Sequence, residues 1–206
     1  MYKFLHEADL KLTDWIYRIR KRLFVKTELK KPNIKCGHGL ILNGLPLLEI
    51  ADNASLEIGN NVTLTSWNKE YHINLNSPVK LYADKPGAHI TIGDNSRIHG
   101  SCLHAYKKIV IGKNCLIAAN CNIIDSNGHE LSFDDPENRI NSKDDPREVT
   151  ISDNVWIGAG CLILPGVIVG EGSVISANSV VSKSIPSHVL AGGNPAIVLK
   201  EYKNIQ

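Results

Sequence analysis

Hydrophobic residues recur every six positions over the C-terminal part of the chain. From residue 151 to 186, the aliphatic residues that open six consecutive blocks are Ile151, Ile157, Ile163, Val169, Ile175 and Val181. The second position of each block is usually small, and the fifth is small or branched. A period of six fits neither an α-helix of period 3.6 nor a lone β-strand of period two. It is typical of a parallel β-helix, in which each short side turns its first residue into the core.

The same pattern reaches back toward the N-terminus with interruptions. A longer signature with a central isoleucine recurs at Ile58, Ile92, Ile111 and Ile151. If three six-residue sides close a coil of about 18 residues, the 19-residue step from Ile92 to Ile111 is one coil. The 40-residue step to Ile151 predicts one coil plus an excursion of 22 residues. The 34-residue step from Ile58 to Ile92 predicts two coils with a trimmed corner.

The N-terminal segment has a different pattern. Apolar residues between Leu10 and Phe24 recur at near-helical spacing and predict an amphipathic helix that starts near Thr13 and Asp14. Lysine and arginine residues crowd the same stretch. Two roles stay open for this helix: a cap on the open end of the solenoid, or contact with an anionic membrane surface.

These patterns predict the organisation of the chain. We expect a helical segment over residues 1–32 and a parallel β-helix over 33–200, with an excursion loop at 126–148 and a C-terminal tail at 187–206.

Charge and cysteine content narrow the class of protein. The formal net charge is only +2, which gives no indication of nucleic-acid binding. Cys102, Cys115, Cys121 and Cys161 fall at the fifth position of their blocks, where we expect small core residues rather than metal ligands. No Cys-x-x-Cys pair, secretory signal or apolar run of about 20 residues is recognisable. We therefore expect a cytoplasmic protein whose membrane contact, if any, is peripheral.

The repeats carry a family resemblance. The run from Val155 to Pro186, followed by Ala-Gly-Gly-Asn-Pro-Ala, resembles the hexapeptide-repeat acyltransferases. It is most similar to their maltose, galactoside, nodulation-factor and capsular-polysaccharide O-acetyltransferases. The resemblance is strong over residues 108–200 and looser over 35–106. It implies an all-β, left-handed parallel β-helix, an acetyl-CoA donor, a sugar or glycan acceptor and a homotrimer with active sites between subunits. The left hand comes from the resemblance alone, because parallel β crossovers are usually right-handed.

The excursion after Ile124 is the expected place for the chemistry, because a solenoid usually ejects a long loop at a binding face. Transfer of an acetyl group to a hydroxyl needs a base, and a histidine, with a pKa of about 6.5, suits that role. His129 alone reads as a surface residue, but the resemblance implies that it is the catalytic base, because the family carries its catalytic histidine just after this coil. Asp125, or else Glu130, is the expected partner of its second nitrogen. A plain turn residue is the alternative for Asp125.

The resemblance also implies a donor site. Small side chains at Ala159 and Ala177 would let the pantetheine arm approach the backbone, and backbone N–H groups near Gly158 would bind the oxyanion. The expected donor-site residues are Trp156, Gly158, Ala159, Ala177, Ser182, Lys183 and Lys200. For Trp156, core packing is the alternative. Ile197 departs from the family, which has an arginine there.

Two histidines allow a rival interpretation. His99 and His104 have the His-x4-His spacing that γ-class carbonic anhydrases use, with a third histidine, to hold zinc. The third ligand would be His72, at a spacing that does not match that family. The resemblance instead implies that His99, His104 and Asn127 contact the acceptor. We expect an O-acetyltransferase with no bound metal; a metal lyase or a non-catalytic β-helix protein is the alternative.

Overall fold

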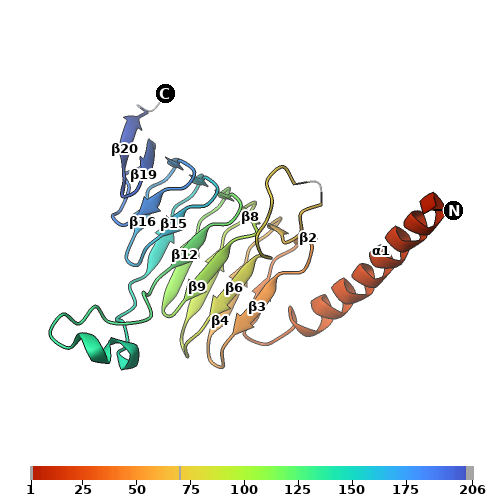
Figure 1. Cartoon of the computed structure of the whole chain (residues 1–206), viewed down its shortest axis with the longest axis horizontal. Coiled ribbons are helices and arrows are strands. Elements are labelled where there is room, and N and C mark those ends of the chain that lie inside the picture. Colours follow the sequence, from red (N-terminus) through yellow and green to blue (C-terminus); the bar gives the residue numbers. More distant parts are fainter. Residues whose placement is uncertain (1, 70, 203–206) are drawn as a thin grey trace.

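The computed structural model describes residues 2–69 and 71–202. A helix, α1 (Tyr2–Thr27), precedes a parallel β-helix, and an antiparallel hairpin ends it (Figure 1). Each coil of the solenoid gives one strand to each of three parallel sheets.

The sheets are named in chain order. The first sheet contains β1 (Ile34–Cys36), β4 (Ser55–Ile58), β7 (His89–Ile92), β10 (Lys108–Ile111), β13 (Val149–Ile151) and β16 (Ile168–Val169). The second contains β2 (Ile41–Asn43), β5 (Thr63–Thr65), β8 (Arg97–His99), β11 (Leu116–Ile117), β14 (Trp156–Ile157), β17 (Val174–Ile175), β19 (Val189–Gly193) and β20 (Ala196–Glu201). The third contains β3 (Leu47–Ile50), β6 (Lys80–Ala83), β9 (Cys102–Ala105), β12 (Asn122–Ile124), β15 (Leu162–Ile163) and β18 (Val180–Val181).

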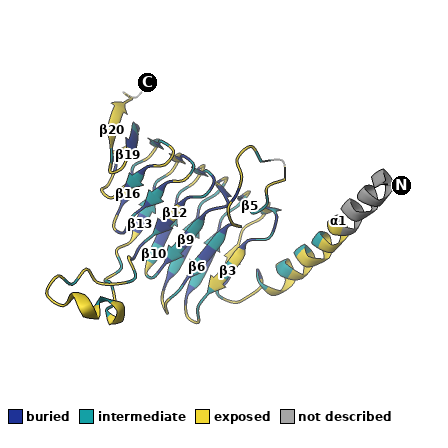
Figure 2. Cartoon of the chain, in the orientation of Figure 1, coloured by how far each residue is buried: buried dark blue, intermediate teal, exposed yellow. Residues whose placement is uncertain are grey.

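The block-opening residues form the core, as the period predicts. Ile151, Ile157 and Ile163 each have 0% exposure, and the fifth-position residues Val155 and Cys161 are also buried. Figure 2 shows the buried positions alternating with outward ones along the strands. Each fully buried aliphatic side chain contributes about 1.5–3 kcal/mol relative to an exposed one, so the stacked aliphatic residues are the main source of stability.

Asparagines stack at the corner between the first and second sheets. Asn61, Asn95, Asn114 and Asn154 all have φ between 55° and 61°. Asparagine tolerates this left-handed conformation better than most residues. Each side-chain amide donates to the next, at 3.3, 3.2 and 3.1 Å, and that of Asn154 donates to Glu171. This ladder explains why an asparagine follows each central isoleucine in the sequence signature.

The register confirms two of the three predicted coil steps. Ile92 pairs with Ile111, and Ile111 pairs with Ile151, so each step is one coil and the second carries the long excursion. The third prediction was wrong. Ile58 pairs directly with Ile92, so this step is one coil with a second excursion over residues 66–79 rather than two coils.

One corner also differs from the predicted block positions. Ser101 occupies the buried place at the corner of β8 and β9, where its Oγ accepts from Cys121 N at 2.9 Å. The block from Ile98 is therefore one residue short, and Cys102 faces outward, half-buried, instead of taking the fifth position. His104 likewise lies outward, and Leu103 opens the next side. Cys115, Cys121 and Cys161 are buried as predicted.

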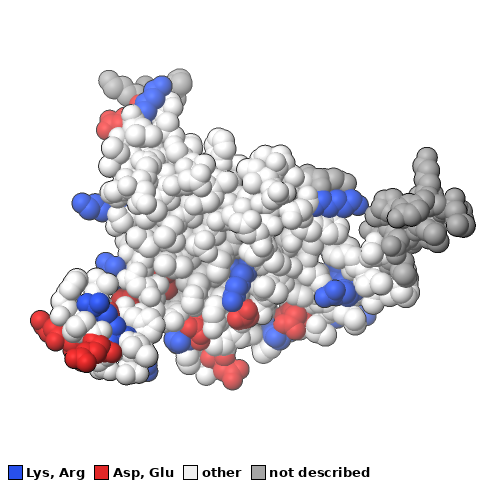
Figure 3. Space-filling view, viewed as in Figure 1, with Lys and Arg blue, Asp and Glu red and all other residues white. Residues whose placement is uncertain are grey.

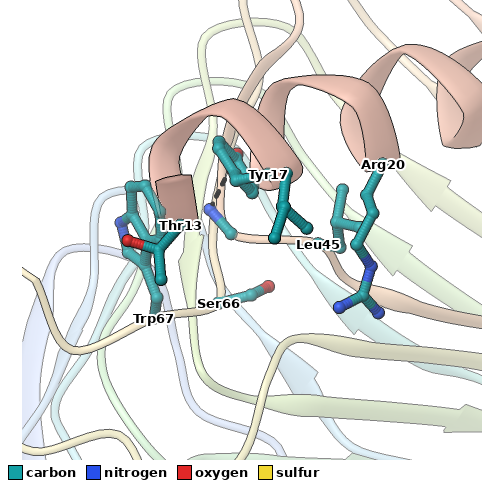
Figure 4. Close-up of a pocket in the computed structure, with 8 residues that line it drawn as sticks. Thr13, Tyr17, Arg20, Leu45, Ser66 and Trp67 are labelled. Atoms are coloured by element: carbon teal, nitrogen blue, oxygen red, sulfur yellow. Dashed lines mark hydrogen bonds between the residues drawn. The ribbon is translucent and has the colours of Figure 1, made fainter. Parts of the chain in front are cut away.

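Helix α1 begins at Tyr2, well before the predicted start near Thr13. Figure 4 shows Tyr17 of the helix against the first coil, where its hydroxyl donates to Leu42 O at 2.9 Å and accepts from Gly44 N at 3.1 Å. Phe24 packs on the core, and the buried Leu29 extends the core past the end of the helix. The rest of α1 projects away from the solenoid (Figure 1). None of the described helices is long and apolar enough to cross a membrane.

Candidate functional site

The corners between sheets position the candidate residues. We call the corner between the second and third sheets the 2–3 corner, and that between the third and first sheets the 3–1 corner. The loop over residues 126–148 leaves at the 3–1 corner, because it follows β12 and precedes β13. The loop over residues 66–79 leaves at the 2–3 corner, because it follows β5 and precedes β6. Figure 1 shows the two loops on opposite sides of the solenoid.

His129 is exposed at the start of the 126–148 loop. The backbone on either side of it is tied down. Asp144 accepts from Asn127 N at 2.6 Å, and the Ser142 hydroxyl accepts from Glu130 N at 2.9 Å. A short 3₁₀-helix, η1 (Pro136–Asn141), lies within the loop. The loop therefore presents the His129 imidazole to solvent from a defined backbone.

Asp125 does not have the partner expected for it. Its carboxylate is fully buried and accepts the backbone N–H groups of Tyr106, Lys107 and Lys108 at 2.7, 2.7 and 2.6 Å. Within the described residues, no hydrogen bond or ion pair joins the His129 imidazole to Asp125 or to Glu130. The expectation that Asp125 orients His129 is corrected: this carboxylate holds the turn between β9 and β10, which is the turn-residue alternative.

Four of the expected donor-site residues lie together. Trp156 points outward from β14 with 50% exposure, so it is not a core residue. Gly158, Ala159 and Ala177 follow at the 2–3 corner. A Cβ on Gly158 would lie 2.5 Å from the Ala177 nitrogen, so a side chain at Gly158 has no room. Ala177 is exposed and Ala159 is half-buried near the indole ring, whereas Gly158 is buried against the next coil. We call these four residues the wall.

The other expected donor-site residues lie elsewhere. Ser182 and Lys183 are exposed at the 3–1 corner after β18. Lys200 is exposed on β20, with its Nζ 4.8 Å from the centre of the Tyr202 ring. One chain thus places His129, Ser182 and Lys183 at one corner and the wall at another.

His104 belongs to a polar cluster on the outer face of the third sheet. Its ring stacks on Tyr82 with centroids 4.4 Å apart and meets Tyr106 edge-on at 5.0 Å. Its Nε2 lies 3.6 Å from Asp84, too far for a hydrogen bond. Tyr82 donates to Asp84 at 2.7 Å, and this hydrogen bond raises the pKa of Tyr82 to about 12. Burial raises the pKa of Asp84, but hydrogen bonds from Lys85 and Tyr82 outweigh it and leave that pKa lowered.

His99 lies on the second sheet, beneath the 66–79 loop. Its ring has 9% exposure and stacks on Tyr71 at 4.7 Å. Its Nδ1 has no hydrogen-bond partner in the described part of the chain. Leaving a buried polar atom unpaired costs about 1–3 kcal/mol. Burial lowers the pKa of His99 to about 4, and the nearby charges of Arg97 and His72 add to the effect.

A pocket of about 320 Å³ opens beside His99. Residues that line it and that sequence reasoning missed are Trp67, Lys69, Tyr71 and Arg97. Trp67, Lys69 and Tyr71 were missed because the step from Ile58 to Ile92 was interpreted as two coils. Arg97 was missed because nothing in the sequence places a loop beside β8. The cluster of an isolated Trp, Lys and Tyr outside any six-residue block was the available signal.

The described residues provide no ligand set for the zinc alternative. No three His, Cys, Asp or Glu side chains of the described residues lie close enough together to hold a metal ion. His99 and His104 lie on the second and third sheets, and His72 is exposed on the 66–79 loop.

Comparison with known proteins supports a transferase. The sequence model of the family described as "Bacterial transferase hexapeptide (six repeats)" matches residues 148–183. The Escherichia coli K12 protein described as the lipopolysaccharide biosynthesis O-acetyl transferase WbbJ is 33% identical over 138 residues, covering 64% of this chain and 70% of that protein. The galactoside O-acetyltransferase of the same strain is 42% identical over 93 residues, covering 45% of this chain and 44% of the relative.

Solved structures agree. A hexapeptide-repeat acetyltransferase from Vibrio cholerae, complexed with acetyl-CoA, is 33% identical with a TM-score of 0.52, over 56% of this chain and 61% of that one. The expected fold class, a left-handed parallel β-helix with an N-terminal helix, is confirmed. The chain spans about half the length of the first curated relatives it matches, 57% and 44%.

The lowered pKa of His99 predicts a pH dependence. Between about pH 4 and 6.5 the folded protein keeps this imidazole neutral, whereas the unfolded chain protonates it. The unfolded state then binds more protons, so stability falls as the pH drops through this window. We expect His99 to titrate near pH 4 by NMR, and His99→Phe to lose less stability on acidification. A midpoint near 6.5, the ordinary value for histidine, would contradict the burial argument.

Proposed function

The chain belongs to the hexapeptide-repeat acetyltransferase family, and we propose that it transfers the acetyl group of acetyl-CoA to a hydroxyl of a sugar or glycan. The observation that carries the donor half of this proposal is the wall at the 2–3 corner, where Trp156 and Ala177 are exposed. A pantetheine arm is long and narrow, and it suits a surface on which a small side chain lies near an exposed indole ring. The sugar or glycan hydroxyl is favoured by the similarity to two O-acetyl transferases, one described for lipopolysaccharide biosynthesis and the other for galactosides.

The wall also offers an oxyanion donor. Gly158 N already donates to Ile175 O at 2.8 Å, and Gly160 N donates to Ala119 O at 2.8 Å. Among the described hydrogen bonds, Ala159 N has no backbone acceptor. We therefore assign to the Ala159 N–H the role of stabilising the negative charge that develops on the acetyl oxygen.

His129 acts as the base in this proposal. Its imidazole takes the proton of the acceptor hydroxyl while the hydroxyl oxygen attacks the acetyl carbonyl carbon. The bond between that carbon and the CoA sulfur then breaks, and His129 returns the proton to the departing thiolate. The products are the acetylated acceptor and free CoA. The fixed backbone on both sides of His129 supports this role, because a base must be held close to the hydroxyl it deprotonates.

A complete site needs two chains. His129 lies at the 3–1 corner and the wall at the 2–3 corner of the same prism, so one chain cannot bring them together. Ile168 is 52% exposed, and Leu162 and Val180 are partly exposed on the outer walls, which leaves apolar surface for a neighbour. We propose a homotrimer with cyclic symmetry, in which each cleft takes its base from one chain and its donor wall from the next.

The phosphate end of CoA requires cations. Lys183 at the 3–1 corner and Lys200 on β20 are proposed to meet it, with Ser182 as a hydroxyl donor. Figure 3 shows acidic side chains gathered on the 126–148 loop, which would repel the phosphates. The phosphate end is therefore placed toward the C-terminal coils. Ile197, 62% exposed, offers no charge where the family has an arginine.

Helix α1 supports a weak membrane contact. Tyr17 and Phe24 face the solenoid, whereas Trp15, Ile19 and Leu23 form an exposed stripe at 60%, 37% and 57% on the opposite side. Basic residues flank this stripe, and a stripe of this kind with flanking cations suits an anionic lipid surface. We propose that the protein works in the cytoplasm and touches the membrane peripherally through α1, with no role for nucleic acid.

Replacing the base should stop the chemistry without removing donor binding. His129→Ala is expected to lower kcat by roughly 10²–10⁴-fold, the usual weight of a positioned base. Acetyl-CoA should still raise the melting temperature of the variant, because the wall is untouched. Turnover close to that of the unaltered protein would remove His129 from the mechanism.

Mixing two inactive variants tests the shared cleft. Ala177→Leu fills the wall and should abolish acetyl-CoA binding, whereas His129→Ala keeps the wall. Co-expressed, the two chains should form mixed trimers in which about a quarter of the clefts combine an intact base with an intact wall. Recovery of about that share of activity, together with a trimeric mass by light scattering, is expected. No recovery in mixed trimers, or a monomer at micromolar concentration, contradicts the shared cleft.

Vesicle binding tests whether α1 contacts an anionic membrane surface. The protein should sediment with vesicles containing phosphatidylglycerol but not with pure phosphatidylcholine, and salt should weaken the binding. The double variant Ile19→Ser/Leu23→Ser should lose it, and Ile140→Ser, on the exposed 126–148 loop, should not. If the double variant instead breaks up the trimer, the stripe is a subunit contact.

A further inference from the structure

The pocket beside His99 has the chemistry of a carbohydrate site. Its polar lining includes Asn43 and Thr65, and its aromatic lining is Trp67 and Tyr71. Amide and hydroxyl groups bond sugar hydroxyls, and aromatic rings stack on the apolar faces of sugar rings. His99 also lines the pocket, and its Nδ1 is buried.

The pocket is preformed. Ser66 and Val79, at the two ends of the 66–79 loop, are joined by a hydrogen bond from Val79 N to Ser66 Oγ at 3.1 Å. In its middle, Asn120 of the next-but-one coil donates to Asn74 O at 2.9 Å and accepts from Asn76 N at 2.9 Å. The loop therefore closes over the second sheet without a ligand.

Two cations also line this pocket. Arg97 and Lys69 have no ion-pair partner within residues 2–69 and 71–202, and the described lining contains no carboxylate. The Lys69 ammonium lies 5.9 Å from the centre of the Trp67 ring. Both side chains are exposed and therefore available to a ligand, and a guanidinium binds phosphate and carboxylate groups through paired hydrogen bonds.

The pocket lies on the same face as the donor wall. Arg97 pairs with Leu116, which pairs with Trp156, so the pocket and the indole ring are two strand spacings apart. At about 4.8 Å per spacing this is about 10 Å. A ligand in the pocket would thus lie about 10 Å from the proposed donor wall.

We infer that this pocket binds the acceptor and selects a sugar that carries an anionic group, phosphate or carboxylate, through Arg97 and Lys69. The inference rests on the proposed function and adds the charge of the substrate. Trp67 and Tyr71 hold the sugar ring, and Asn43 bonds one of its hydroxyls.

Binding calorimetry without acetyl-CoA tests the inference, with galactose, galactose 1-phosphate and galacturonic acid as probes. At least one charged probe should bind ten times more tightly than galactose at low salt, and added salt should reduce the difference. Arg97→Met should remove the preference, and Lys69→Met should weaken it. Lys35→Met, which removes an exposed cation on the first sheet, should change nothing.

The outcomes separate this inference from the proposed function. Three results would each overturn the inference. Neutral and charged probes could bind equally, the preference could survive the loss of both cations, or a protein that binds acetyl-CoA could bind no sugar. The thermal shift with acetyl-CoA is measured on the same samples. A protein that prefers the charged sugar but gives no shift with acetyl-CoA would keep the charged pocket and refute the acetyltransferase. Phosphate and carboxylate selection are told apart by which charged probe binds, and a melting curve of each variant shows that it is folded.

Discussion

Everything in this structure depends on the exact superposition of one coil on the next. Parallel strands hydrogen-bond at a fixed spacing of about 4.8 Å, so each residue of a coil meets its equivalent one turn away. Ile58, Ile92, Ile111 and Ile151 are such equivalents, and each packs on the last. The same superposition aligns the asparagines of the corner ladder and leaves Gly158 against the Ala177 backbone. A side chain that fits one coil must therefore fit its neighbours, and this requirement produces the six-residue period.

The same constraint decides how much the sequence could predict. The coil step from Ile111 to Ile151 was predictable, because the hexads stop and resume on either side of a visibly polar segment. The 66–79 loop was not, because the 34-residue step from Ile58 to Ile92 is close to the length of two coils. The burial of Leu75 and Val79 comes from packing on neighbouring coils, as with Leu75 beside Gly100, and a single sequence does not show which coil is the neighbour. The one-residue shortening at Ser101 was hidden for the same reason.

The residues of the candidate site show the same difference between regular and irregular segments. The expectation that Trp156, Gly158 and Ala177 lie together came from the family resemblance, and the regular repeats explain why the structure has them close to one corner. The partners of Asp125 did not, since they are backbone amides of the preceding coil, which carry no sequence signal. The charged lining contributed by Arg97 and Lys69 comes from two segments that approach only after the loop has folded over the sheet. The pocket beside His99 thus combines residues of a regular coil with residues of the 66–79 loop.

The antiparallel hairpin at the C-terminal end has a consequence of its own. A stack of parallel strands ends in a row of unpaired N–H and C=O groups, which is a template for adding further strands. Here β19 pairs with β17 in the parallel sense and then with β20 in the antiparallel sense, so the direction of the second sheet reverses at its last strand. Val169 of the first sheet is likewise met by a single bridge to Ile185. A second molecule that stacked on this end would find no parallel edge to extend on the second sheet. The hairpin thereby opposes the end-to-end stacking of further molecules on the second sheet, which would otherwise build a fibre.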